Sequence, residues 1–474
     1  MRTDVYMNYL DYFKKICSIP HGSGNVQAIS DYLVSFANEH NLECHRDEAL
    51  NVIIIKEASK GREGDEPVII QGHMDMVAVS DDGRDMTKVP LELKEDGDFL
   101  YADKTSLGGD DGIAVAYGLT LLSDETLSLP RIELVVTTDE EVGMIGATAL
   151  DTSVLKGKRM INIDSEEEGI FLVSCAGGAR IDISFPLTET SPEGGEAYEI
   201  NVEGLLGGHS GTEINKGRAN AIRLMGRILK KLADAKLLLA INDIKGGTAD
   251  NAIALGCTAT VLCKPIESEL FEIIKYEVME KYLKIETTAE ITLKKAEACA
   301  NSGKWFYNPE ATLSGLLTTL PNGVIAMSKD IEGLVETSLN AGIIRMDEKG
   351  VNISISVRSS IDEEKKNLVN HVLEIAANHG ASTNVHGDYP GWAYRENSPL
   401  RDRMVEVYTE MFGSRPEIRA LHAGLECGVF AGKIRDLDCI SFGPNLYDIH
   451  TTGERMSLSS AKRMWDYLVK VLEK

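Results

Sequence analysis

Several features that would place the chain in a familiar class are missing from its sequence. No apolar run approaches the roughly 18 to 20 residues that a membrane-spanning helix needs, so we expect no membrane span. The first residues have neither the apolar core nor the small-residue cleavage site of a secretory signal peptide. Basic residues are scarce: 49 lysines and arginines are outnumbered by 74 acidic residues, for a formal net charge of -25. Because phosphate binding needs clustered lysine and arginine, this balance argues against nucleic acids and anionic membranes as partners.

The sequence also lacks three short motifs that would point to other chemistries. The eight cysteines are scattered and form no CxxC pair, which is typical of reduced thiols and predicts a cytoplasmic protein. The segment Gly22-Ser-Gly-Asn25 does not continue to GxGxxG, the fingerprint of dinucleotide binding. The segment Gly208-His-Ser-Gly-Thr212 lacks the final glycine of a GxSxG nucleophile elbow, which disfavours a serine hydrolase.

Length and patterning predict two domains, one of them inserted into the other. The 474 residues exceed one ordinary domain of about 150 residues, and the apolar fraction of 43% allows sizeable cores. Up to residue 180, helical patterns alternate with β-rich runs such as Val52–Ile55, Val68–Ile70 and Ile132–Val136, which predicts an α/β fold with a largely parallel sheet. Residues 181–390 instead show alternating strands and polar helices, which predicts an α+β insertion. The mixed α/β pattern returns in residues 391–474.

Acidic residues and histidines gather in five clusters of the flanking domain. Four follow predicted strands, namely His73-Met-Asp75, Asp139-Glu-Glu141, Asp164 and a loop with His450, while Gly108-Gly-Asp-Asp-Gly112 opens an apolar helix. Ligands of an open α/β sheet bind outside the carboxyl ends of its strands, so we expect these side chains to converge. Such concentrated negative charge repels itself unless cations are bound, which predicts a site for one or two divalent ions. Histidine with several carboxylates suits zinc and leaves cobalt or manganese open.

Each cluster taken alone has an ordinary structural explanation. A single histidine such as His73 is more often structural than a metal ligand. The pair Glu140-Glu141 is typical of a solvated loop or helix cap, and Asp110-Asp111 would make a good helix N-cap. Their common placement at one predicted edge of the sheet is what favours a joint metal site.

These motifs together resemble those of the co-catalytic zinc peptidases of family M20, and within that family those of the aminoacyl-histidine dipeptidases. The resemblance extends over essentially the whole chain. Further matching motifs are Gly207-Gly-His-Ser-Gly211, Gly246-Gly-Thr-Ala-Asp-Asn251, Arg358-Ser-Ser360 and His422-Ala-Gly-Leu-Glu-Cys-Gly428. The resemblance implies a catalytic domain of the zinc-peptidase type, formed by residues 1–180 and 391–474, with a mixed, largely parallel sheet. It also implies an inserted α+β lid domain formed by residues 181–390.

The resemblance also implies a set of ligands for two metal ions. His73 and Asp164 would bind one ion, Glu141 and His450 would bind the other, and Asp110 would bridge both.

One departure from the family pattern bears on the bridging residue. The family usually has Leu-Gly-Ala-Asp-Asn-Gly where this chain has Leu107-Gly-Gly-Asp-Asp-Gly112, so Asp111 can compete chemically with Asp110.

Three catalytic roles are implied in the same way. Asp75 would orient the imidazole of His73. Glu140 would be the general base for a hydroxide that bridges the two metal ions, and would pass the proton to the leaving amine. His209 resembles the lid histidine that reaches the substrate carbonyl, although the same segment considered alone is a tight turn with an exposed histidine.

Substrate-binding residues are expected from the two charged ends of a dipeptide. Arg358 suits bidentate binding of the carboxylate, Asn251 would add a hydrogen bond, and Glu426 would neutralise the amine. For each of these residues alone, an ordinary salt bridge explains the residue type equally well.

The sequence therefore predicts a dipeptidase with broad, Xaa-His-like specificity for unblocked dipeptides, and leaves a monomer or a homodimer open. The alternatives are an aminoacylase or carboxypeptidase with the same metal ligands, or a peptide-binding protein without activity. Glu140 opposes the last alternative because only catalysis needs a base there.

Overall fold

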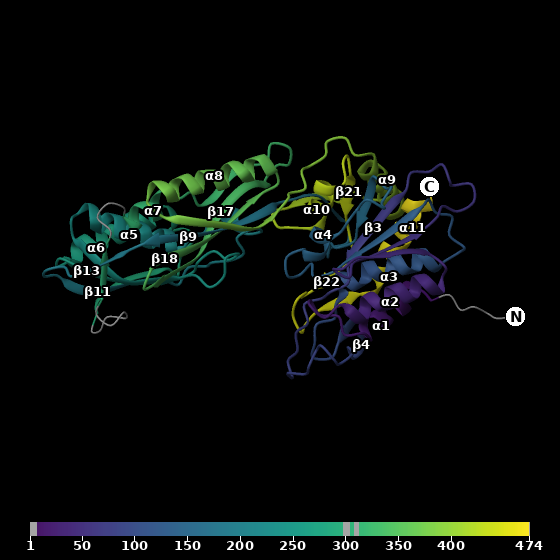
Figure 1. Cartoon of the computed structure of the whole chain (residues 1–474), viewed down its shortest axis with the longest axis horizontal. Helices are drawn as coiled ribbons and strands as arrows, with labels where there is room; N and C mark the ends of the chain where they lie inside the picture. Colours follow the sequence, from purple (N-terminus) through teal and green to yellow (C-terminus); the bar gives the residue numbers. More distant parts are fainter. Residues whose placement is uncertain (1–6, 297–303, 308–311, 474) are drawn as a thin grey trace. The chain divides into compact units, whose positions relative to one another are not determined.

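The computed structural model describes residues 7–296, 304–307 and 312–473, and contacts divide the chain into two units (Figure 1). The first unit comprises Met1–Cys175, Trp392–Ala420 and Leu425–Lys474. The second comprises Ala176–Gly391 and Leu421–Gly424. The roles of a catalytic domain for residues 1–180 and 391–474 and of a lid for residues 181–390 stay predictions.

The first unit contains an eight-stranded mixed sheet with the strand order β1-β2-β6-β3-β7-β21-β8-β20. These strands are β1 (Glu43–Arg46), β2 (Val52–Lys56), β3 (Val68–His73), β6 (Ile132–Thr137), β7 (Arg159–Asn162), β8 (Ile170–Cys175), β20 (Glu417–Leu421) and β21 (Asp438–Ser441). The central strands β6, β3, β7 and β21 run parallel, whereas β1, β2 and β8 pair antiparallel with their neighbours. Every residue of β3 and of β6 is buried, as expected for parallel strands covered on both faces. The predicted α/β fold with a largely parallel sheet centre is confirmed.

Helices cover this sheet, and one of them is wholly buried. All residues of α3 (Gly109–Ser123) are buried, and α3 contacts β3, β6 and α1 (Tyr9–Cys17). A helix that is apolar on every side needs such an interior position. The other helices of the unit are α2 (Gln27–Glu39), α4 (Ile145–Ala149), α9 (Pro399–Phe412), α10 (Glu426–Lys433) and α11 (Leu458–Glu473). A small antiparallel sheet adds β22 (Leu446–Tyr447), β23 (Arg455–Ser457), β5 (Phe99–Ala102) and β4 (Leu93–Asp96).

The second unit is built on an antiparallel sheet with helices packed against it. Its main strand order is β14-β11-β13-β12-β17-β18-β9-β19. The strands are β9 (Gly177–Pro186), β10 (Thr188–Thr190), β11 (Glu196–Glu203), β12 (Leu238–Gly246), β13 (Cys257–Cys263), β14 (Glu290–Lys295), β15 (Trp305–Tyr307), β16 (Gly323–Met327), β17 (Val335–Asp347), β18 (Gly350–Ser359) and β19 (Ser382–Tyr389). The helices are α5 (Ala221–Asp234), α6 (Ser268–Met279), α7 (Leu313–Thr319) and α8 (Asp362–Asn378), with short 3-10 turns η1 (Ile214–Lys216) and η2 (Glu280–Tyr282). The α+β insertion is therefore confirmed.

Burial alternates along the strands of the second unit. In β11, buried Tyr198, Ile200 and Val202 alternate with less buried residues. This pattern is typical of a sheet that packs one face on a core and leaves the other more open. The core beneath that face includes Ile222, Met225 and Leu229 of α5, at helical spacing.

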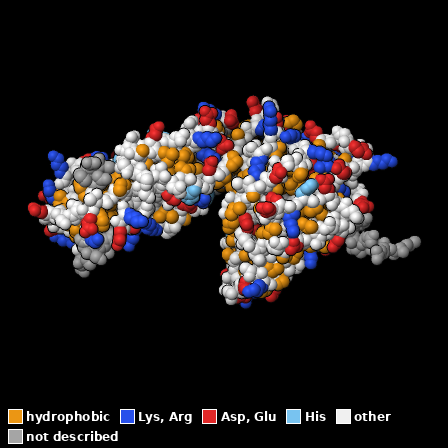
Figure 2. All heavy atoms as spheres, in the orientation of Figure 1, with side chains coloured by type: hydrophobic (Ala, Val, Ile, Leu, Met, Phe, Trp, Pro, Cys, Tyr) orange, Lys and Arg blue, Asp and Glu red, His pale blue; other side chains and the backbone are white. Residues whose placement is uncertain are grey.

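The surface and the cysteines agree with the composition. Acidic and basic side chains are interspersed over the visible face of both units (Figure 2). Within the described ranges, no helix combines the length and apolar character that crossing a membrane requires. The seven described cysteines are free, and Cys299 lies outside the described residues.

Close packing of α3 against the sheet gives a stability prediction. A Cβ atom at Gly118 would lie 2.3 Å from Leu134 Cδ1 and 2.8 Å from Leu134 Cδ2. We expect Gly118→Val to lower the free energy of unfolding by about 1–3 kcal/mol, because Leu134 is buried and cannot move without repacking. Urea denaturation measures the change. Gly64→Ala is the control: no described atom lies within 4 Å of its Cβ position, and equal destabilisation by both variants would contradict the packing argument.

Candidate metal centre

Five residues that the sequence predicts as metal ligands lie together in the first unit. His73 ends β3, Asp164 follows β7, and Glu141 lies in the turn after β6. Asp110 is in the first turn of α3, and His450 lies in the loop between β22 and β23. Because β6, β3 and β7 are parallel, their carboxyl ends share one edge of the sheet, and this edge carries the cluster.

The carboxylate of Asp110 contacts both histidines, one with each oxygen. Its Oδ1 lies 3.1 Å from His73 Nε2, and its Oδ2 lies 3.1 Å from His450 Nε2. His73 Nε2 is also 3.8 Å from Asp164 Oδ1, and His450 Nε2 is 2.9 Å from Glu141 Oε1. Two groups of three possible ligands result, each with its ligand atoms within 4.8 Å of one another: His73 with Asp110 and Asp164, and Asp110 with Glu141 and His450. This arrangement fits two cations that share one carboxylate.

Asp111 is placed differently from Asp110. Its Oδ2 accepts a hydrogen bond from the backbone N–H of His73 at 3.3 Å, and burial raises its pKa well above the ordinary value. It therefore supports the backbone of β3, while Asp110 contacts the two imidazoles.

Glu454 holds the turn that presents Asp110, and no sequence motif points to this residue. Its buried carboxylate accepts hydrogen bonds from the N–H groups of Leu107, Gly108 and Gly109 at 2.8, 3.2 and 2.8 Å. Gly108 has a φ of 69°, a left-handed conformation that favours glycine, and a Cβ there would lie 2.8 Å from Met76 Sδ. A single acidic residue in an unremarkable loop thus fixes the start of α3.

Asp75 connects His73 to the turn after β6. His73 Nδ1 lies 2.9 Å from the backbone oxygen of Asp75 and 3.5 Å from its carboxylate. The carboxylate itself accepts hydrogen bonds from the N–H groups of Glu140 and Glu141 at 3.0 and 3.4 Å, and from Ser23 Oγ at 2.8 Å. Asp75 therefore orients the imidazole mainly through its backbone oxygen, and uses its side chain to position Glu140 and Glu141.

The cluster concentrates negative charge in a buried place. Burial and the charge of Asp110 raise the pKa of Asp164 well above its ordinary value, and burial raises the pKa of Glu140 to about 8. Hydrogen bonds to Asp110 and Glu141 raise the pKa of His450 to about 10. These pKa shifts indicate that the carboxylates favour a nearby positive charge, which divalent ions would supply. Nitrogen and oxygen ligands of this kind suit zinc.

Glu426 lies beneath the sheet edge and is fully buried at 0% exposure. Its Oε2 accepts hydrogen bonds from Gln71 Nε2 at 2.5 Å and from Thr137 Oγ1 at 2.6 Å, contacts that the sequence did not predict. Its Oε1 has no hydrogen-bond partner among the described residues, and burial raises its pKa to about 7. One oxygen of this carboxylate therefore remains able to accept a hydrogen bond.

The remaining predicted residues, His209, Asn251 and Arg358, belong to the second unit. His209 Nδ1 accepts hydrogen bonds from the N–H groups of Gly211 and Thr212 at 3.2 and 3.1 Å. Burial and the charge of Arg358 lower the pKa of His209, which favours the neutral ring. Because Nδ1 accepts hydrogen bonds, the proton of the neutral ring lies on Nε2. This tautomer makes Nε2–H a donor.

Arg358 and Asn251 lie close to this histidine within the second unit. Arg358 is 9% exposed; it donates a hydrogen bond to the Tyr389 hydroxyl at 3.3 Å, and its Nε has no partner among the described residues. The backbone oxygen of Asn251 accepts a hydrogen bond from Ser210 N–H at 2.8 Å. The Nε of Arg358 is therefore a buried donor that a ligand could use.

His422 is a further buried histidine of the second unit. It is 5% exposed, its Nε2 lies 2.8 Å from Ser338 Oγ, and burial and the charge of Arg358 lower its pKa to about 3. It belongs to a motif that the sequence analysis singled out, but no role followed from the motif.

Comparisons with known proteins give one family and relatives that match along nearly the full length of the chain. A model of the family described as Peptidase family M20/M25/M40 matches residues 69–474. The chain is 36% identical to the cytosol non-specific dipeptidase of Escherichia coli (strain K12), with 98% of this chain and 96% of that protein covered. The crystal structure of aminoacylhistidine dipeptidase from Vibrio alginolyticus matches with a TM-score of 0.90 and 34% identity, covering 98% of this chain and 96% of that one. Aminopeptidase PepT from Bacillus cereus ATCC 10987 shares the fold, with a TM-score of 0.57, 16% identity, and 98% and 97% of the two chains covered.

The depressed pKa of His422 predicts a pH-dependent stability. The folded protein keeps this ring neutral down to a pKa of about 3, whereas its ordinary value is 6.5, so its stabilising contribution is present above pH 6.5 and is lost as the pH falls. In His422→Asn this loss is absent. We therefore expect the difference in free energy of unfolding between wild type and variant to change by about 2 kcal/mol between pH 7.5 and pH 5, with wild type losing more.

Urea denaturation at a series of pH values tests this. His371→Asn, at an exposed position of α8, is the matched control, and we expect no such change for it. A wild-type-to-His422→Asn difference that stays constant with pH would contradict a neutral buried His422.

Proposed function

Because the chain belongs to Peptidase family M20/M25/M40 and is thus a hydrolase of the metallopeptidase type, we propose that it hydrolyses the peptide bond of unblocked dipeptides with broad specificity. The observation that carries this proposal is the carboxylate of Asp110 between two groups of metal ligands, with Glu140 next to the ligand Glu141. The dipeptidase names of the Escherichia coli and Vibrio alginolyticus relatives support the substrate class. The former is named a cytosol enzyme, which supports a cytoplasmic location for this chain.

We propose two zinc ions as the cofactors. His73, Asp110 and Asp164 would hold one ion, and Asp110, Glu141 and His450 would hold the other. When bound, such ions polarise a carbonyl group and lower the pKa of water into the neutral range. The first unit would then be the catalytic domain and the second unit the lid.

Glu140 is the residue best placed to move the proton. Its backbone N–H is held by the Asp75 carboxylate at 3.0 Å, so the side chain starts from a fixed position beside the ligand cluster. It would accept a proton from the attacking water and deliver it to the nitrogen of the leaving amine. Only a side chain with two protonation states can do both.

The two charged ends of a dipeptide and its carbonyl call for three kinds of partner, and the chain has all three. The Nε2–H of His209 would donate to the carbonyl oxygen and stabilise the developing negative charge. Arg358, with its unpaired Nε, would bind the carboxylate with help from Asn251, and Glu426 would accept from the free amine through Oε1. An N-acylated amino acid has no such amine, which distinguishes this proposal from an aminoacylase.

The proposal is tested by hydrolysis of a panel of free dipeptides, tripeptides and N-acylated amino acids, with chelated and zinc-restored protein. We expect zinc-dependent cleavage of the dipeptides alone. Glu140→Gln should lower kcat by a factor of about 10²–10⁴ or more at unchanged zinc content, because proton transfer is lost and the ligands remain. Glu167→Gln, an exposed position paired with Arg419, is the matched control and should keep full activity.

Two results would contradict the proposal. Cleavage of N-acylated amino acids in place of dipeptides would indicate an aminoacylase. Two bound zinc ions without cleavage of any member of the panel would indicate a binding protein.

The contacts of Asp75 predict an effect on metal binding. In Asp75→Asn, an amide would replace a carboxylate that accepts from two backbone N–H groups, and the backbone of Glu140 and Glu141 would lose its anchor. We expect zinc affinity to fall by about 10–100-fold. Competition titration with a zinc chelator measures it, and Asp85→Asn, an exposed position bonded to Lys88, is the control. Equal affinity of Asp75→Asn and wild type would show that this anchor is dispensable.

A further inference from the structure

The segment Gly22-Ser-Gly-Asn25, which does not complete a dinucleotide fingerprint, lies between α1 and α2 and pairs with the residues just after β3. Ser23 N–H donates to the backbone oxygen of Met76 at 3.2 Å, and Met76 N–H donates to the backbone oxygen of His21 at 3.2 Å. The two stretches form a parallel bridge. The segment is therefore a short added strand beside the loop that follows β3.

Two glycines allow this approach. A Cβ at Gly22 would lie 2.8 Å from Ala78 Cβ, closer than carbon atoms of neighbouring side chains pack. Gly24 has a φ of 77°, in the left-handed region that glycine adopts without strain. Contacts within the protein therefore explain both glycines of the motif.

Hydrogen bonds connect the segment to the acidic residues beside the metal ligands. Ser23 Oγ donates to Asp75 Oδ2 at 2.8 Å, and Asp75 Oδ1 accepts from the N–H of Glu140 at 3.0 Å. Gly24 N–H donates to Asp139 Oδ1 at 2.6 Å. Two paths of hydrogen bonds thus start in the segment: one ends on the backbone of Glu140, and the other ends on the side chain of its neighbour Asp139.

Asp139 has a backbone conformation that needs support. Its φ is 51°, in the left-handed region that residues other than glycine rarely adopt, although aspartate and asparagine tolerate it better than most. Its backbone oxygen accepts from the N–H of Ile145 at 3.1 Å, and that of Glu140 accepts from the N–H of Met144 at 2.8 Å. The conformation of Asp139 therefore sets the direction of the turn that presents Glu140.

We propose that Ser23 and Asp139 are positioning residues that hold Glu140 in place for proton transfer, with Gly24 supplying a backbone donor. Ser23 acts through Asp75, and Asp139 acts through the turn. The inference rests on the proposed function, because the position of Glu140 affects the rate only if Glu140 transfers the proton. A displacement of about 1 Å at such a group can lower the rate about 10²-fold.

Three substitutions separate the conformation of Asp139 from its hydrogen bond. Asp139→Asn keeps an oxygen acceptor and the tolerance of the left-handed region, Asp139→Gly keeps only the tolerance, and Asp139→Ala keeps neither. With saturating zinc and a free dipeptide, we expect kcat within about threefold of wild type for Asp139→Asn, about tenfold lower for Asp139→Gly and about 10²-fold lower for Asp139→Ala. KM should change by less than about threefold, because substrate contacts remain.

The hydroxyl of Ser23 is tested by a loss and a rescue. Ser23→Ala removes the donor to Asp75, and Ser23→Thr keeps a hydroxyl. We expect kcat to fall about tenfold in Ser23→Ala and to stay within about threefold of wild type in Ser23→Thr. A purely structural role of the segment would not give this split between kcat and KM.

A second measurement involves neither metal nor hydrolysis. Amide hydrogen exchange of the metal-free full chain, followed by mass spectrometry, reports how firmly residues 138–146 are held. Asp139→Ala and Ser23→Ala should speed exchange there by about tenfold or more, because the hydrogen bonds that fix the turn are lost. Asp139→Asn should leave the exchange unchanged.

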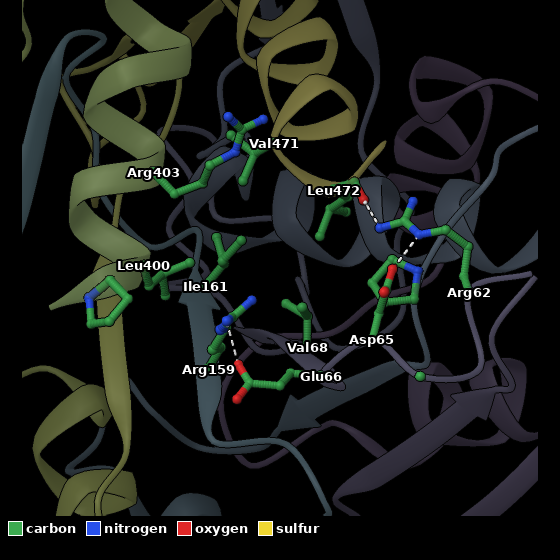
Figure 3. Close-up of a pocket in the computed structure, with 13 residues that line it drawn as sticks. Arg62, Asp65, Glu66, Val68, Arg159, Ile161, Leu400, Arg403, Val471 and Leu472 are labelled. Carbon is green, nitrogen blue, oxygen red and sulfur yellow. Dashed lines mark hydrogen bonds and ion pairs between the residues drawn. The ribbon is translucent and has the colours of Figure 1, made fainter. Parts of the chain in front are cut away.

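Two controls lie away from the turn. Asp436→Gly changes an exposed aspartate that also has a left-handed φ, of 62°. Glu66→Ala removes the partner of Arg159 beside a cavity of about 420 Å³, at the other ends of β3 and β7 (Figure 3). Both variants should keep kcat and the exchange of residues 138–146 within about twofold of wild type.

Several results would overturn the proposal: equal kcat for Asp139→Asn and Asp139→Ala, unchanged exchange in Asp139→Ala and Ser23→Ala, or faster exchange with unchanged kcat. If the wild-type protein cleaves no dipeptide, the proposed function fails, and the exchange measurement decides the positioning of Glu140 by itself. Faster exchange in the two variants would then support it, and unchanged exchange would overturn it.

Discussion

The shared carboxylate of Asp110 is the contact on which the geometry of the candidate metal centre depends. One oxygen lies 3.1 Å from His73 and the other 3.1 Å from His450, so the end of β3 and the loop after β22 are tied to the start of α3 through one side chain. Glu454 keeps this side chain in place because it accepts three backbone N–H groups just before it. The burial of α3, which its apolar sequence requires, also helps to keep Asp110 in place between the two imidazoles.

This geometry has an electrostatic consequence for the whole edge of the sheet. Burial raises the pKa values of Asp164, Glu140 and Glu426 together, so the protein without cations holds several carboxylates where they are poorly solvated. A folded chain tolerates this because the surrounding backbone supplies donors, as Asp75 shows with Glu140 and Glu141. The buried carboxylates therefore lower the local stability of the protein, and the same burial makes them favour cations strongly.

The sequence predicts much of this arrangement because its signals are local. The runs Val68–Ile70 and Ile132–Val136 predict strands, and the polar residues that follow them predict a shared edge, which is where the structure has His73 and Glu141. The antiparallel order of the insertion is not predictable in detail, because pairing between distant strands leaves no local mark. Glu454, Gln71 and Thr137 cannot be found by sequence analysis for the same reason. The partners of Glu454 are 345 or more positions away in the sequence, and Glu426 is 355 positions from Gln71 and 289 positions from Thr137. The sequence predicts that Asp75 orients His73, and only the three-dimensional contacts show that its carboxylate also binds the backbone of Glu140 and Glu141.

Two buried groups, one in each unit, bear on the substrate. In the first unit, Glu426 Oε1 is an acceptor without a partner among the described residues, so this position favours a ligand that brings a donor such as a free amine. In the second unit, Arg358 Nε is a donor without a partner among the described residues, so that position favours a ligand that brings an acceptor such as a carboxylate. Unpaired buried groups are unfavourable unless a ligand satisfies them. Each preference, taken by itself, is met by a free peptide end and not by a blocked one.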